Sequence, residues 1–364
     1  MKVLYAVVVC FVLLVFTEQA QALPKFSART GWKCQSCHVN PSGGGMRNPA
    51  GVTYGREELP VPTWSEELGL ENFSTDLTDF VAVGADVRTL FFYQQTGPDE
   101  TQNALFQMQG DLYINLKLAK KVNIYFDKGL YSGFEIFGLL NVLPMNGHVK
   151  AGKFVPNYGL KLDDHRAFVR EYIGFSPEVG SPYFTGAEVG IAPGPLSVTG
   201  GVYNSTEGRG ESIASEKAFL GRVEGLFGVS DDVYVGLGAN ALYKDVMGGK
   251  TNFLGGFGAV GIAGFSLIGE VDMLKSDIAG VKKDAFVVFV EGDYAITQGF
   301  DLKAMYDFYD EDLDLATGTT SRYSFGFEFF PISGVEVRPL YRIVKEEPTD
   351  TDNNEIHVLL HFYL

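Results

Sequence analysis

The stretch that decides the fold covers residues 105–118 and reads LFQMQGDLYINLKL. Its odd-numbered positions are mainly polar, as at Gln107 and Asp111, and its even-numbered positions are mainly apolar, as at Leu112. Successive side chains of a β-strand point to opposite faces, so the pattern predicts a strand with one polar and one apolar face. The same alternation recurs at 322–329 and 335–343. From residue 77 onward the chain repeats such units of roughly ten residues, which predicts about sixteen strands.

The connections between these units alternate in length. Tight turns are predicted at 119–121, 193–195, 229–231, 297–299 and 332–334, and longer loops at 95–102, 156–182, 205–215, 310–320 and 347–354. Short periplasmic turns and long extracellular loops are typical of an outer-membrane barrel, whose apolar face contacts lipid. A soluble β-fold with its apolar face inward is the alternative. We expect an all-β, transmembrane outer-membrane β-barrel of about 16 antiparallel strands over residues 77–364.

The N-terminus indicates export. Lys2 precedes an uncharged apolar run from Val3 to Phe16, and Ala20-Gln21-Ala22 follows. This layout predicts a signal peptide over residues 1–22 that is cleaved before Leu23, with an uncleaved anchor as the alternative. We therefore expect the outer membrane of a Gram-negative bacterium. The formal net charge of −16 argues against a nucleic-acid partner, because such proteins neutralise phosphates with Lys and Arg.

One chemical motif follows the predicted cleavage site, Cys34-Gln-Ser-Cys37-His38. Cys-x-x-Cys-His is the attachment sequence of c-type haem, in which two thiols bind the porphyrin and the histidine ligates iron. A thioredoxin-like redox pair would need a βαβ context, and a zinc site would need a fourth ligand that residues 23–75 do not supply as Cys or His. We predict one covalent haem c in an N-terminal segment, residues 23–76.

The second axial ligand has several candidates. Met46 follows His38 after a flexible glycine run, and His/Met ligation is known in cytochromes c. His357 and His361 should point into the lumen, and His148, near a predicted periplasmic turn, is expected at the surface. His165 becomes a candidate if the long connection 155–181 folds into the lumen as a constriction. A solvated loop over the mouth is the alternative for that connection.

The sequence resembles the outer-membrane monohaem cytochrome–porin fusions associated with extracellular iron oxidation. The matching residues are Leu23-Pro-Lys-Phe26, Ala28-Arg-Thr-Gly31 and the Cys34, Cys37, His38 motif, followed by a porin-like barrel. The resemblance implies that Cys34 and Cys37 bind haem covalently and that His38 ligates its iron. It also implies that the haem lies in or at the barrel and passes electrons across the outer membrane.

These observations predict an electron carrier rather than an enzyme. Its expected partners are a periplasmic c-type cytochrome or similar redox carrier and an extracellular electron donor or acceptor, with ferrous iron as a candidate donor. The alternative is a solute or ion porin whose haem-bearing segment acts as a plug or sensor. A haem enzyme such as a peroxidase is a third hypothesis, for which no acid–base pair can be placed.

Overall fold

The computed structural model describes residues 25–70, 73–96, 100–130, 133–175, 182–205, 216–351 and 353–364. The predicted signal peptide and the first two residues after it lie outside this range. Within the described residues, five short helical segments come before the first strand, and one more lies between strands. They are α2 (Lys25–Thr30), α3 (Cys34–Cys37), α4 (Pro49–Thr53), the π-helix η1 (Tyr54–Glu58), α5 (Pro62–Glu67) and α6 (Phe168–Glu171).

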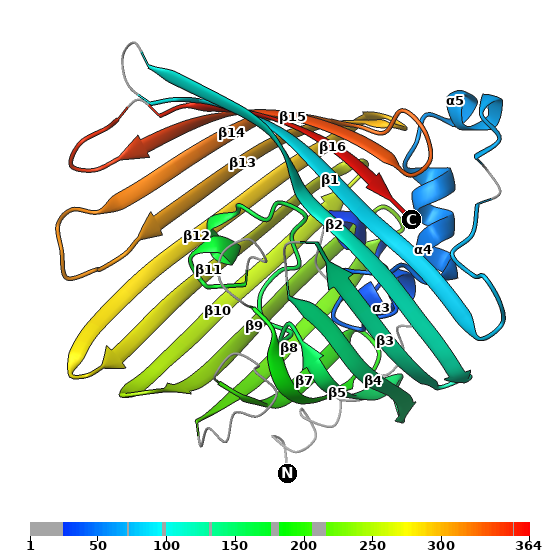
Figure 1. The fold of residues 1–364 in the computed structure, drawn as a ribbon, viewed down its shortest axis with the longest axis horizontal. Helices are drawn as coiled ribbons and strands as arrows, with labels where there is room; N and C mark the ends of the chain where they lie inside the picture. Colours follow the sequence, from blue (N-terminus) through cyan, green and yellow to red (C-terminus); the bar gives the residue numbers. More distant parts are fainter. Residues whose placement is uncertain are drawn as a thin grey trace.

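Sixteen antiparallel strands form one closed barrel, which confirms the predicted architecture (Figure 1). The strands are β1 (Val81–Gln95), β2 (Thr101–Ala119), β3 (Val122–Gly129), β4 (Phe134–Leu143), β5 (Gly147–Phe154), β6 (Phe184–Ile191), β7 (Leu196–Asn204), β8 (Lys217–Ser230), β9 (Val233–Val246), β10 (Gly249–Ile262), β11 (Phe265–Ile278), β12 (Val281–Thr297), β13 (Phe300–Asp310), β14 (Thr319–Phe329), β15 (Val335–Glu346) and β16 (Glu355–Tyr363). Each strand pairs with its neighbours in sequence, and β1 closes the sheet by pairing with β16, with Arg88 opposite His361. Closure satisfies the backbone hydrogen bonds that an open edge would leave exposed to lipid.

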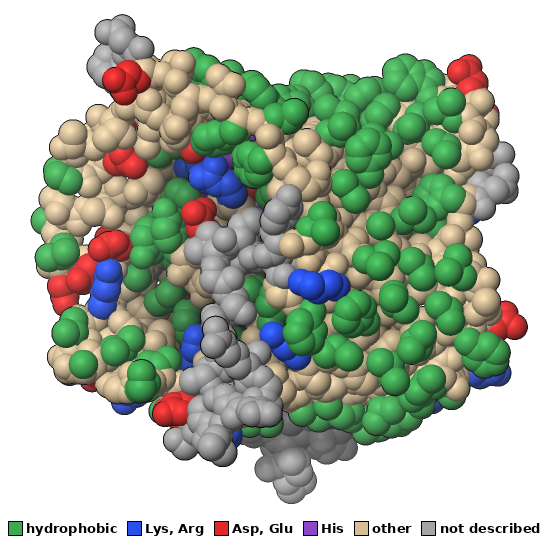
Figure 2. Space-filling view, viewed as in Figure 1, with side chains coloured by type: hydrophobic (Ala, Val, Ile, Leu, Met, Phe, Trp, Pro, Cys, Tyr) green, Lys and Arg blue, Asp and Glu red, His purple; other side chains and the backbone are tan. Residues whose placement is uncertain are grey.

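The two faces of the barrel differ in chemistry, as the alternation predicts. On β14, Phe325 is 51% exposed on the outside, whereas Glu328 is fully buried on the inside. Hydrophobic side chains cover much of the outer face (Figure 2), a surface suited to a lipid bilayer. Among the described residues, no helix is long and apolar enough to cross a membrane.

Most connections have the predicted lengths, which gives the barrel two distinct ends. We call the end with turns such as 120–121 and 231–232 the short-turn mouth, and the opposite end the long-loop mouth. Two connections at the long-loop mouth, 247–248 and 279–280, have only two residues and so depart from strict alternation. Helices α4 and α5 lie at the short-turn mouth, beside the C-terminus (Figure 1).

One expectation about the wall is wrong. His148, predicted at the surface, is only 8% exposed. It does lie next to the short turn between β4 and β5, but its side chain points to the inner face, against Gly190 of β6. A position near a turn does not fix exposure, because strand parity still decides which face a side chain occupies.

Candidate functional site

The Cys-x-x-Cys-His motif forms a single helical turn inside the barrel. At the end of α3, the His38 amide donates a hydrogen bond of 2.8 Å to the Cys34 carbonyl. Both cysteines and the histidine therefore belong to the same helical turn. Cys34 and Cys37 both carry free thiols. The turn therefore presents two sulfurs about one helical turn apart with an imidazole directly after them.

The chain that follows packs tightly against this turn. The Asn48 amide donates to the Cys37 carbonyl at 2.9 Å, and its side chain donates to the Gln35 carbonyl at 3.2 Å. A Cβ on Gly51 would lie 2.0 Å from the Cys37 carbonyl oxygen, so only glycine fits there. These contacts hold the motif in place without using its thiols or its imidazole.

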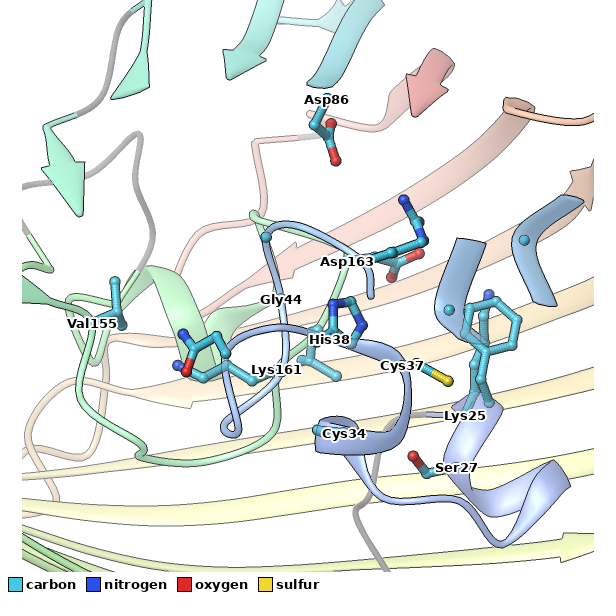
Figure 3. Close-up of a pocket in the computed structure, with 18 of the residues that line it drawn as sticks. Lys25, Ser27, Cys34, Cys37, His38, Gly44, Asp86, Val155, Lys161 and Asp163 are labelled. Carbon is cyan, nitrogen blue, oxygen red and sulfur yellow. The ribbon is translucent and has the colours of Figure 1, made fainter. Parts of the chain in front are cut away.

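A cavity of about 280 Å³ opens beside the motif (Figure 3), close to the usual size of ligand sites. Its lining comes from three parts of the molecule. The N-terminal segment forms one side through the motif, the glycine run 43–45 and aromatic residues such as Tyr54. Residues 155–170 and Tyr183 of the connection between β5 and β6 form another side, and the barrel wall closes the rest. Lining residues from the latter two include Lys161, Asp163, His165, Asp86, Arg88 and Tyr113.

The residues around this cavity fit a covalently attached haem. Within the described chain, the buried Nδ1 atom of His38 has no hydrogen-bond partner. Burial and the nearby charge of Arg47 lower the pKa of His38 to about 4 and outweigh the opposing effect of the Gly45 and Gly44 backbone beside the ring. The ring is therefore in the neutral form that binds metals. A Cβ on Gly43 would lie 2.7 Å from the Cys34 sulfur, and one on Gly44 would meet open space. The glycine run thus leaves the thiol side of the cavity clear.

The candidate axial ligands lie in different places. His165 is buried and lines the same cavity as His38, with its Nε2 atom 3.3 Å from Nη1 of Arg88. Met46 lines a second cavity, of about 240 Å³, which His38 also borders. The cause is local geometry: His38 pairs with Arg47 in an antiparallel bridge, and Met46, next to Arg47, turns to the other face. Met46 packs against the wall, where its amide donates to the Tyr125 hydroxyl at 3.1 Å.

The two C-terminal histidines point into the lumen, as predicted, but they engage carboxylates. His357 lies 2.8 Å from Glu355, and His361 lies 2.8 Å from Glu336 and 3.1 Å from Asp86. Neither belongs to the described lining of the cavity beside the motif.

The described part of the connection between β5 and β6 that follows β5, residues 155–175, folds into the lumen, which confirms the inward alternative. Barrel carboxylates accept hydrogen bonds from its backbone: Glu270 from the Leu160 amide at 2.7 Å, and Asp307 from the Phe168 amide at 2.8 Å. Barrel arginines pair with its side chains. Arg338 lies 2.6 Å from Asp163, and Arg342 lies 2.5 Å from Asp164.

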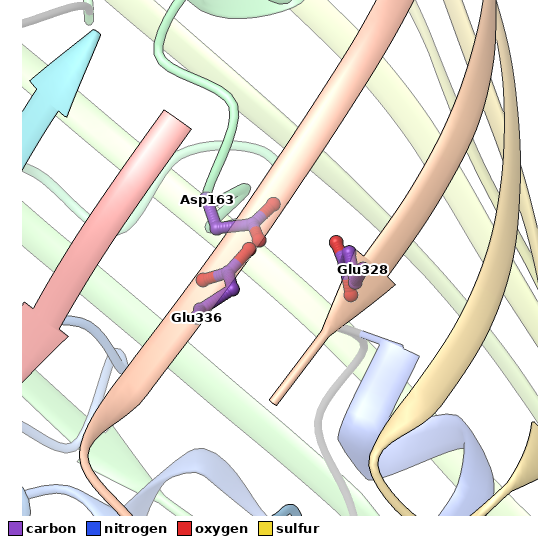
Figure 4. A group of neighbouring side chains, drawn as sticks. All are labelled: Asp163, Glu328 and Glu336. Atoms are coloured by element: carbon purple, nitrogen blue, oxygen red, sulfur yellow. The ribbon is translucent and has the colours of Figure 1, made fainter. Parts of the chain in front are cut away.

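Asp163, Glu328 and Glu336 bring their carboxylates within 4.8 Å of one another (Figure 4). Cations surround this group: Arg338 contacts Asp163, Lys303 lies 3.1 Å from Glu328, and Lys25 of α2 also pairs with Glu328. The cluster is therefore a buried ion-pair network that ties the N-terminal segment and the inward loop to one patch of wall. This ion-pair network was not predicted from the sequence. The charged residues at inward positions of neighbouring strands were the sequence feature that could have indicated it.

Comparison with known proteins supports the barrel. No family model matches the sequence, and no curated protein matches it. The anion-selective porin of Comamonas acidovorans is similar in structure, with a TM-score of 0.59, 12% identity, and coverage of 78% of this chain and 99% of that one. OmpT of Vibrio cholerae gives a TM-score of 0.58 at 14% identity, covering 80% of this chain and 100% of the other. At these identities the likeness concerns the fold: the chain is a closed barrel of the outer-membrane porin type.

Proposed function

We propose that Cys34 and Cys37 attach one haem c, that His38 ligates its iron, and that the protein transfers electrons across the outer membrane. The observation that carries this proposal is the placement of the motif. Both cysteines and His38 line a cavity inside the barrel, and the Nδ1 atom of His38 itself has no hydrogen-bond partner among the described residues. A bilayer insulates electrons, so a redox group held within the barrel wall is the feature that electron passage requires.

The chain's own residues have separable tasks. The thiols would hold the group covalently, His38 would ligate its iron, and the glycine run leaves room beside Cys34. His165, which lines the same cavity as both cysteines, is one candidate for a second iron ligand, and Met46 is the candidate that the sequence suggests. When bound, haem c supplies one-electron redox chemistry, while the protein supplies ligation, orientation and exclusion of bulk water.

The expected setting follows from the predicted signal peptide and from the porin-type fold. The protein would lie in the outer membrane, with a periplasmic c-type cytochrome or similar carrier at the short-turn mouth and an extracellular donor or acceptor at the other. The resemblance to cytochrome–porin fusions supports this assignment and suggests ferrous iron as a donor. In this role the protein is an electron carrier and not an enzyme.

The test is a pyridine haemochrome assay on the protein purified from outer membranes, followed by redox titration in proteoliposomes. One covalent haem per chain, reduced by a donor added outside the vesicles, is expected. Absence of covalent haem would overturn the proposal.

A second candidate is a solute or ion porin in which the N-terminal segment is a plug or sensor. The structural comparisons favour this candidate more directly, because one similar structure is described as an anion-selective porin. Conductance in planar bilayers separates the two. If electron transfer is the function, the haem must change redox state, whatever the conductance. High conductance together with a haem that does not change redox state would make transport the primary function.

A further inference from the structure

Trp32 connects the cavity beside the motif to the surface. Its side chain is 44% exposed, yet it also lines that cavity together with Phe26 and Tyr54. The ring centroids of Trp32 and Tyr54 lie 6.1 Å apart, and those of Tyr54 and Phe26 lie 5.7 Å apart. An aromatic wall therefore separates the cavity from the outside here, and one of its members faces solvent.

This aromatic wall lies at the short-turn mouth. A Cβ on Gly31, next to Trp32, would lie 2.4 Å from the Tyr234 ring, and the Tyr234 hydroxyl donates to the Asp231 carbonyl in the turn between β8 and β9. The charge around it is mainly negative. Exposed carboxylates of the described residues at this mouth belong to Glu57, Glu58, Glu66, Glu67, Asp76, Asp79, Asp231 and Asp232, whereas the exposed lysines there are Lys120 and Lys121. Glu57 pairs with Arg56, so Glu58, Asp231 and Asp232 are the better probes of the charge near Trp32.

We infer that the short-turn mouth around Trp32 is the docking face for a cationic protein that carries single electrons. Exposed tryptophans are enriched at the centres of protein interfaces, and a carboxylate rim attracts a positively charged partner and orients it. The inference rests on the proposed function: one electron leaves one redox centre and enters the other, and no bond forms or breaks.

Trp64 shows why Trp32 is singled out. Its side chain is similarly exposed, at 47%, but it packs edge-on against Phe329 at the end of β14, with ring centroids 5.9 Å apart. It is not among the described residues that line the cavity. The two tryptophans thus differ in their relation to the cavity and not in exposure, which makes Trp64 a matched control.

The experiment measures binding of a lysine-rich cytochrome c to the haem-loaded protein in nanodiscs, where both mouths are accessible. Binding that weakens as salt rises is expected for the natural chain. Trp32→Leu should raise Kd about tenfold, which corresponds to ~1.4 kcal/mol, a loss that only a minority of interface residues produce when truncated. Trp64→Leu should leave Kd unchanged.

Two triple variants test the charge. Glu58→Gln with Asp231→Asn and Asp232→Asn should weaken binding and flatten its salt dependence. Glu100→Gln with Asp314→Asn and Glu347→Gln removes the same number of exposed charges from the long-loop mouth and should change neither. Equal effects of the two triples, or no effect of Trp32→Leu in haem-loaded protein, would overturn the docking face alone. Self-association through Trp32 instead of cytochrome binding would also overturn it. A chain without haem would overturn the proposed function, and with it the redox character of the partner.

Discussion

Two segments enter the barrel lumen, and they are held there in different ways. The inward loop, described over residues 155–175, is bound to the wall at several points: barrel carboxylates accept hydrogen bonds from its amides, and Arg338 and Arg342 pair with Asp163 and Asp164. The N-terminal segment 25–70 is held mainly near its ends. Arg29 pairs with Asp301 at 2.6 Å, and the Ser333 hydroxyl lies 3.0 Å from the Ser65 hydroxyl.

The middle of the N-terminal segment, around the cysteines, bonds largely to itself. Its wall contacts are fewer, such as the Lys150 ammonium donating to the Ser42 hydroxyl at 3.0 Å. The cavity lies where the tightly matched loop faces this self-contained turn. The difference indicates a division of tasks, in which the loop closes the barrel and the N-terminal segment carries the chemistry.

The largest effect should come from changes to the cysteines of the N-terminal segment. Cys34→Ala with Cys37→Ala should abolish covalent haem, because no thiol remains in the predicted mature chain. Haem-stained denaturing gels would show this, and heat modifiability on the same gels should show an intact barrel. Ser36→Ala, between the two cysteines, should retain haem. Covalent haem in the double variant would contradict the assignment.

Substitution of Arg342 tests whether the inward loop closes the lumen. Arg342→Met leaves Asp164 buried without its main partner, and loss of one member of a buried pair costs about 3–5 kcal/mol. We expect the loop to loosen and single-channel conductance to rise several-fold. Lys345→Met on the same strand removes an exposed cation that pairs with Asp350, so conductance should stay at its original level. An unchanged Arg342→Met channel would show that the loop does not close the lumen.

A third test asks which segment provides the second axial ligand. His165→Gln should change the visible spectrum of the haem-loaded protein, because His165 lines the cavity that Cys34 and Cys37 also line. Met46→Leu should leave the spectrum intact, since Met46 faces the second cavity, whose described lining includes His38 but neither Cys34 nor Cys37. Loss of a near-infrared Met–iron band in Met46→Leu would reverse this assignment and place both ligands on the N-terminal segment.

Gly51→Ala should have a smaller effect on the same segment. The added methyl group would lie 2.0 Å from the Cys37 carbonyl oxygen, and overpacking of this kind costs about 1–3 kcal/mol. We expect a partial loss of haem incorporation, measured as the ratio of Soret absorbance to protein. Thr53→Ala, an exposed position in the same helix, should incorporate haem normally. A Gly51→Ala chain with full haem content would indicate that the turn can shift without penalty.

Acid should have the smallest of these effects, and it should act on the contacts that hold the inward loop. Burial alone would raise the pKa of Asp164, but Arg342, Arg322 and Arg338 outweigh it and hold that pKa below its ordinary value of 3.8. A carboxyl whose pKa is lowered in the folded state stabilises that state above its unfolded value, and this contribution is lost as pH falls further. Conductance should therefore stay constant from neutral pH to about 4 and rise below it. Asp164→Asn should remove this part of the acid response; an unaltered profile would assign the response to other groups.

Much of the fold could be predicted from the sequence because strand parity is a local property. Gln107 and Leu112 reveal opposite faces without knowledge of any partner strand. The inward loop was only one of two alternatives, because the groups that hold it, such as Glu270 and Asp307, lie on strands far along the chain. The orientation of Met46 depends on the register of a bridge closed by three glycines with positive φ, and spacing from His38 does not reveal it.

The seam between β1 and β16 has a consequence for the order of assembly. The Leu364 amide donates to the Ala85 carbonyl at 2.9 Å, so the barrel is complete only when the last strand meets the first. The N-terminal segment precedes the first strand, and its residues 34–38 lie inside the finished wall. Any machinery that acts on residues 34–38 must therefore reach them before the seam shuts, and the time available for cofactor loading ends with strand closure.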